Sequence, residues 1–116
     1  MIFQSFILVI VGLSAIVAQE LYSDKYDHIN VDEILANSRL RESYLQCYLR
    51  SGPCVTADAK FFRDTFAEAV LTQCVKCTAR QTEIFNKITD WYTKNEPEKY
   101  NMVIAKAVKF LAMNNH

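Results

Sequence analysis

The chain has 116 residues, of which 13 are basic and 13 acidic, so its formal net charge is zero. Hydrophobic residues make up 51% of it, and only two Gly and two Pro occur. The length predicts one domain. Balanced charge argues against nucleic-acid binding and against a polybasic membrane patch, since both need a basic face. So few Gly and Pro leave little material for the tight turns of a many-stranded sheet, which favours an all-α fold.

The N-terminus is typical of a secretory signal peptide. Residues 1–18 carry no charged side chain, and 7–17 is almost wholly apolar before polar Gln19 and Glu20 follow. A retained membrane anchor is the less favoured alternative, because the run is short for a span of about 20 residues and no Lys or Arg marks its inner end. We therefore expect residues 1–18 to be removed and 19–116 to form one secreted domain in an extracellular fluid, with no further segment able to span a membrane.

Apolar side chains then recur at helical spacing along most of the chain. The stretches with this pattern are 31–36, 39–50, 57–73, 78–95 and the segment from Pro97 onward. No alternation of strand period longer than four residues interrupts them. The pattern predicts five helices, whose apolar stripes are in the first place a hydrophobic core.

Local residues indicate where these helices begin. Asn30 and Glu33 offer a capping box for the first helix, and Ser38 is placed to cap the second. Thr56 opens the third. Pro97 breaks the chain and then suits the first turn of the last helix, where its missing N–H costs nothing.

The four cysteines form the pattern C-x6-C-x19-C-x2-C at Cys47, Cys54, Cys74 and Cys77. Three pairings are possible. Pairing neighbours closes two small loops worth roughly 2–2.5 kcal/mol each, against nearly 4 for the longer loops of the crossed pairings. Loop entropy alone thus favours a crossed pairing, and the sequence leaves the pairing open. A zinc site needs two closely spaced cysteine knuckles, and a thioredoxin-like site needs a strand before its C-x-x-C. Neither is present, and we expect structural disulfides and no metal site.

Catalytic motifs are lacking. The histidines are His28, in a charged segment, and His116, at the end of the chain. The sequence contains no G-x-S-x-G, no glycine-rich phosphate loop and no H-E-x-x-H. The carboxylates alternate with Lys and Arg on helix surfaces, as in Arg63-Asp64. We expect no enzymatic activity and no cofactor.

One segment carries a specific resemblance. Residues 24–37, DKYDHINVDEILAN, are similar to the N-terminal signature of the insect chemosensory proteins, a family of small secreted helical carriers. The cysteine pattern, Gly52-Pro53-Cys54, Gln81 and Asn95-Glu96-Pro97-Glu98 also match, so the resemblance runs from about Tyr22 to Val103.

The resemblance implies an all-α fold of five to six helices around a hydrophobic channel, with disulfides between neighbouring cysteines that close two small loops. It implies a monomeric carrier of odorants, pheromones or other small apolar ligands, including fatty-acid-like chains. Family positions that line the channel or its mouth map onto Tyr22, Tyr26, Tyr44, Phe62, Gln81, Ile88 and Trp91, with Tyr100 at a surface aromatic position.

The chain departs from the family pattern at three places. The spacing between the second and third cysteines is one residue longer than usual. Tyr100 stands where Trp is common, and Trp91 where a smaller side chain or Tyr is common. Beyond Val103 the usual Tyr-Asp-Pro break is absent, so the last helix is expected to continue.

A second hypothesis places the protein in a different functional class. A small helical domain held by disulfides could act as a secreted interaction or developmental protein, with no ligand inside. Its partner would bind an exposed apolar patch, for which the last helix is the candidate through Val103, Ile104, Val108, Phe110 and Leu111.

Overall fold

A computed structural model describes residues 20–114. Its helices are α2 (Val31–Ala36), α3 (Ser38–Tyr48), α4 (Ala57–Thr72), α5 (Ala79–Asn95) and α6 (Pro97–Asn114). Over this range the structure confirms the all-α fold, and no helix in it is long and apolar enough to cross a membrane. The predicted signal peptide, residues 1–18, and His116 lie outside the described residues.

Side-chain caps fix where the helices begin. Asn30 accepts a hydrogen bond from the Glu33 backbone N–H at 3.1 Å, and Thr56 accepts one from Ala59 at 3.2 Å, as the sequence predicts. The expected cap of α3 is wrong by one residue. Asn37 is the N-cap and accepts from the Leu40 N–H at 3.0 Å, because its own N–H already closes the end of α2. One asparagine thus ends one helix and starts the next.

Two helices end earlier than their apolar patterns suggest. The apolar side chains predict that α3 continues to residue 50. The helix ends at Tyr48 instead, and Arg50 adopts a left-handed backbone with φ 60°. At the end of α4, Gln73 (φ 55°) and Cys74 (φ 60°) do the same. Left-handed backbone reverses the chain at helix ends and is usually supplied by glycine. Gly52-Pro53 predicts that the second helix ends before residue 52, but no glycine marks the exact end of either helix.

A disulfide closes the chain at each of these reversals. The bonds join Cys47 to Cys54 and Cys74 to Cys77, and no cysteine is free within residues 20–114. The pairing implied by the family resemblance is therefore confirmed. Each bond closes a short loop at a helix end.

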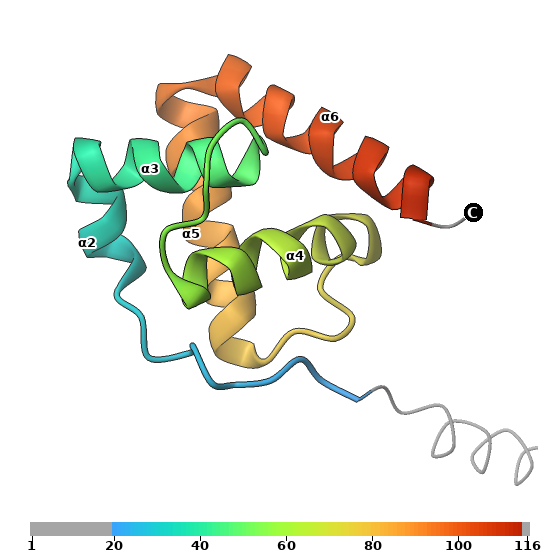
Figure 1. Cartoon of the computed structure of the whole chain (residues 1–116). Coiled ribbons are helices and arrows are strands. Elements are labelled where there is room, and N and C mark those ends of the chain that lie inside the picture. Colours follow the sequence, from blue (N-terminus) through green and yellow to red (C-terminus); the bar gives the residue numbers. More distant parts are fainter. Residues whose placement is uncertain (1–19, 115–116) are drawn as a thin grey trace, which may run out of the picture.

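The helices enclose one core. In Figure 1 the long α5 passes behind α3 and α4, and α6 runs across the upper part of the molecule. Helix α6 contacts both α4 and α5, and α2 contacts α3 and α5. The unbroken α6 confirms that the chain continues as a helix past Val103. The segment before α2 runs beside the α4–α5 loop, where the Tyr22 N–H donates to the Lys76 carbonyl at 2.8 Å.

Candidate functional site

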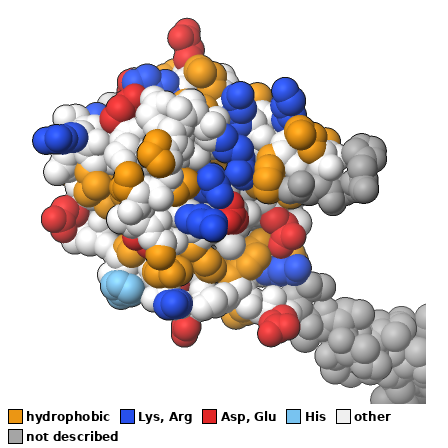
Figure 2. Space-filling model, in the orientation of Figure 1, with side chains coloured by type: hydrophobic (Ala, Val, Ile, Leu, Met, Phe, Trp, Pro, Cys, Tyr) orange, Lys and Arg blue, Asp and Glu red, His pale blue; other side chains and the backbone are white. Residues whose placement is uncertain are grey.

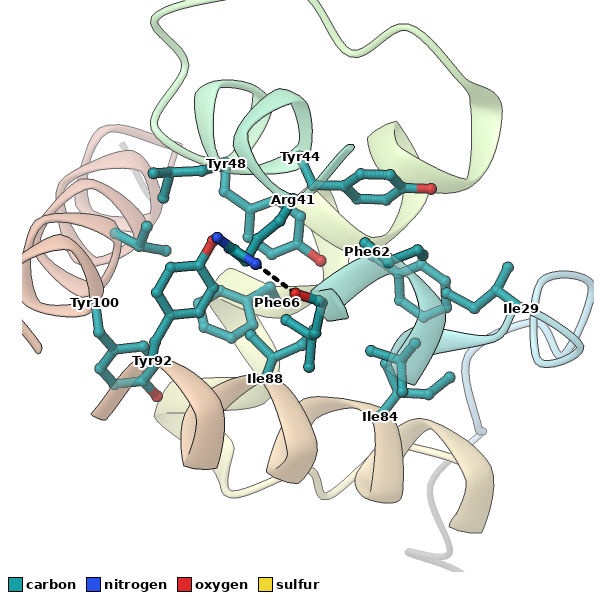
Figure 3. Close-up of a pocket in the computed structure, with 15 residues that line it drawn as sticks. Ile29, Arg41, Tyr44, Tyr48, Phe62, Phe66, Ile84, Ile88, Tyr92 and Tyr100 are labelled. Atoms are coloured by element: carbon teal, nitrogen blue, oxygen red, sulfur yellow. Dashed lines mark hydrogen bonds between the residues drawn. The ribbon is translucent and has the colours of Figure 1, made fainter. Parts of the chain in front are cut away.

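An apolar cavity of about 50 Å³ lies among all five helices. Helical spacing brings its walls together, because Ile84, Ile88 and Tyr92 lie four residues apart on one face of α5. The fifteen described residues that line it are Ile29, Val31, Ile34, Leu35, Arg41, Tyr44, Leu45, Tyr48, Phe62, Phe66, Ile84, Ile88, Tyr92, Tyr100 and Val103. Fourteen are aliphatic or aromatic, and Figure 3 shows most of these side chains around a common centre.

Three of the residues that the resemblance assigned to the channel or its mouth meet at this cavity: Tyr44, Phe62 and Ile88. Tyr100, which the resemblance placed at a surface aromatic position, lines the cavity as well. The Tyr44 ring lines it while its hydroxyl donates to the Asp58 carboxylate in a short hydrogen bond. The Tyr100 hydroxyl lies 2.8 Å from Thr89 Oγ1. Both hydroxyls are therefore held at the edge of the cavity by other polar groups.

The N-terminal residues of the assigned set, Tyr22 and Tyr26, lie outside the cavity. The Tyr22 hydroxyl donates to Glu68 at 2.6 Å. The Tyr26 ring packs on Phe61, with ring centroids 5.1 Å apart. These contacts hold the N-terminal segment against α4, and a role for either residue in ligand binding stays a prediction.

Gln81 and Trp91 also lie outside the cavity. Gln81 is 1% exposed, and its amide nitrogen donates to the Ser23 carbonyl at 2.8 Å and to Asp27 at 2.9 Å. Trp91 lines a separate surface groove beside α2 and α5. Direct ligand contact by these two residues likewise stays a prediction.

Three polar residues of the site were not predicted from the sequence. Tyr48 and Tyr92 lie on predicted apolar stripes but were assigned to the core, although both line the cavity. Arg41 is the one charged residue among the described lining residues. The sequence did not indicate a role for Arg41 in the site, because a charged side chain on a helix is ordinarily exposed to solvent.

Burial raises the pKa of three of the cavity tyrosines above the ordinary value of 10.0. It raises the pKa of Tyr92 from 10.0 to about 12, an effect that the Arg41 charge opposes. Burial, followed by the hydrogen bond to Asp58, raises the pKa of Tyr44 to about 12. Burial raises the pKa of Tyr48 well above its usual range. The site therefore offers apolar surface and neutral hydroxyls at physiological pH.

The arrangement suits enclosure better than chemistry. Within residues 20–114, no group of three or more His, Cys, Asp or Glu side chains is placed to hold a metal ion. A pocket for a small molecule usually spans about 300–1,000 Å³. The cavity is much smaller at about 50 Å³, so a long chain enters only if the aromatic walls move apart.

The apolar patch predicted on the last helix is largely covered, because Val103 is buried and Ile104, Phe110 and Leu111 are half-buried. Met102 and Met113 on the same helix are exposed. Val103 is 5% exposed and faces the cavity. Phe110, which lies off the main stripe, is covered by the Arg50 guanidinium at 3.7 Å from its ring centre. Figure 2 shows Lys and Arg side chains gathered where α6 approaches the α3–α4 region. Val108 remains 42% exposed.

Comparison with known proteins gives a consistent result. Residues 22–113 match the family model described as the insect pheromone-binding family, A10/OS-D. The chain is 34% identical to ejaculatory bulb-specific protein 3 of Drosophila melanogaster, over 85% of this chain and 78% of that protein. It is 37% identical to allergen Tha p 1 of Thaumetopoea pityocampa, over 75% and 68% of the two chains.

Solved structures agree in fold. A chemosensory protein in complex with bromo-dodecanol superposes with a TM-score of 0.69 at 37% identity, over 74% of this chain and 85% of that one. The antennal chemosensory protein A6 from the moth Mamestra brassicae gives 0.64 at 36% identity, over 77% and 82%.

Proposed function

The chain belongs to the insect pheromone-binding family A10/OS-D, and on this premise we propose that it carries a small apolar ligand enclosed among its five helices. The observation that supports this most strongly is the composition of the cavity wall, where fourteen of fifteen described residues are aliphatic or aromatic. The apolar N-terminal run supports release of the mature chain, residues 19–116, into an extracellular fluid. The protein would act by solubilising its ligand, without catalysis.

The driving force is the transfer of apolar surface out of water. A chain of twelve or so methylenes at about 0.8 kcal/mol each gives roughly 10 kcal/mol gross. Lost ligand freedom and the movement of the walls reduce this figure. We expect a dissociation constant in the micromolar range, which suits a carrier that must also release its ligand.

The experiment is displacement of a fluorescent apolar probe from the oxidised mature protein by linear C8 to C18 alcohols. We expect saturable one-site binding with an optimum chain length, because an enclosed cavity has a finite length. The absence of saturable binding to a correctly folded sample would contradict the proposal.

Wall variants locate the binding site. Tyr44→Ala and Ile88→Ala each remove apolar contacts from the cavity wall, and we expect each to weaken dodecanol binding about three- to tenfold. Leu71→Ala is the matched control, because Leu71 is 54% exposed on α4 and lies outside the cavity. Unchanged affinity in both wall variants would place the ligand elsewhere.

A further inference from the structure

Arg41 brings a positive charge to a cavity that is otherwise apolar. It lies on α3, and its side chain points toward the cavity in Figure 3. Its charge opposes the effect of burial on the pKa of Tyr92, another lining residue. A guanidinium is always charged at physiological pH and offers five N–H donors in a planar fork. An uncharged ligand alone would leave this group unused.

The structure fixes the guanidinium but uses little of its donor capacity. One N–H donates to the Leu35 carbonyl at 2.5 Å, as Figure 3 shows. The planar group lies over the Trp91 ring, 4.1 Å from its centre. Stacking on an aromatic face orients a guanidinium while leaving its in-plane donors available.

No carboxylate of residues 20–114 forms an ion pair with Arg41. The nearby acidic side chains of Glu42 and Glu96 are instead paired with Lys99, at 3.8 and 2.7 Å. The charge of Arg41 is therefore left without a partner at the same place where the apolar wall is interrupted.

We propose that Arg41 is a head-group site that binds the carboxylate of a long-chain fatty acid, whose hydrocarbon chain occupies the apolar cavity. This inference rests on the proposed carrier function and narrows its ligand class from apolar molecules in general to anionic ones. Trp91 is then a positioning residue, which acts through Arg41 without touching the ligand.

The geometry favours a carboxylate over a hydroxyl or an ester. Two parallel N–H···O bonds join a guanidinium to a carboxylate, and charge-assisted bonds of this kind are about twice as strong as neutral ones. An orientation already fixed by Trp91 lowers the entropy lost on binding. The Tyr92 hydroxyl, which is protonated at neutral pH like that of an ordinary tyrosine, lines the same cavity and is a further donor for the carboxylate.

The test compares dodecanoate, methyl dodecanoate and dodecanol at neutral pH, below their micellar concentrations, on the oxidised mature protein. We expect dodecanoate to bind about tenfold more tightly than the methyl ester. Arg41→Met should remove this preference, which is read as the ratio of dodecanoate to methyl dodecanoate affinity within the same variant. Arg41→Lys keeps the charge but loses the fork, and should retain part of the preference.

The matched control is Arg39→Met, which removes an exposed charge from the same helix and should preserve the preference. Dodecanol binding without a preference for dodecanoate, or a preference that survives Arg41→Met, would overturn the assignment of Arg41 and leave the carrier function standing. Loss of the preference in Arg39→Met would also overturn it, by showing an effect of overall charge. Failure of all three ligands to bind wild-type protein would overturn the carrier function itself.

Discussion

Tyr44 and Tyr92 present their rings to the same cavity, but their hydroxyls have different surroundings. The Tyr44 hydroxyl donates to Asp58, and the Tyr92 hydroxyl lies near the Arg41 charge. Burial is the first cause of the raised pKa in each, from 10.0 to about 12. A phenol that must stay neutral in the folded state links folding stability to alkaline pH.

The expected result is a loss of stability at high pH. Because the folded pKa lies above the unfolded one, this contribution is fully present below pH 10 and is lost as pH rises toward about 12. Tyrosinate absorbance and the free energy of unfolding, both measured from pH 8 to 12, check it. Titration of all tyrosines near pH 10 in folded protein would contradict it, and Tyr44→Phe should delay the fall.

Some of the individual residues of the site could be predicted from the sequence. The family resemblance indicated Tyr44, Phe62 and Ile88 as channel residues, and all three line the cavity, together with Tyr100, which it placed at the surface. Arg41 could not be found, because its role depends on Trp91, which is fifty positions further along the chain on another helix. Helical periodicity reports which face of one helix is apolar and says nothing about contacts across helices.

At the scale of single helices, the N-terminus of α5 is held by several side-chain hydrogen bonds. Thr78 and Gln81 form a complete capping box. The Gln81 amide also donates to Ser23 and Asp27, and the Thr78 hydroxyl donates to Asp27 at 2.7 Å. These bonds attach the segment before α2 to α5, so the start of this helix is also the anchor of the N-terminal segment.

We expect Gln81→Leu to lower the free energy of unfolding by about 1–3 kcal/mol, because it leaves buried polar groups without partners. Urea unfolding of the oxidised protein measures the loss, with Gln46→Leu as a control on a less buried glutamine. Dodecanol affinity of the folded variant should stay unchanged. A stable variant with lost affinity would instead support ligand contact by Gln81, as the family resemblance implies.

Helix starts were easier to predict than helix ends. Asn30 and Thr56 cap through their own side chains, a signal contained in a few neighbouring residues. The ends at Arg50 and Gln73 depend on left-handed backbone at residues other than glycine. The disulfide loops that follow them are a tertiary constraint, and loop entropy did not indicate the pairing.

For the whole molecule, the central claim is that a ligand occupies the space among α2 to α6. Helix α6 has a special part in this, because it contacts α4 and α5 and supplies both Tyr100 and Val103 to the cavity wall. Since the cavity is only about 50 Å³, enclosing a dodecyl chain requires these helices to separate. The side chains nearest the ligand should therefore be identified in the complex itself.

The most direct test is NMR of oxidised mature protein with labelled isoleucine methyl groups, mixed with dodecanol. Residues 20–116 contain five isoleucines, and four of them line the cavity: Ile29, Ile34, Ile84 and Ile88. Ile104 lies on α6 outside the cavity and is the internal control. We expect intermolecular NOEs from the dodecanol chain to those four methyl groups and none to Ile104. NOEs to Ile104 alone, or to no isoleucine of a protein that binds dodecanol, would contradict it.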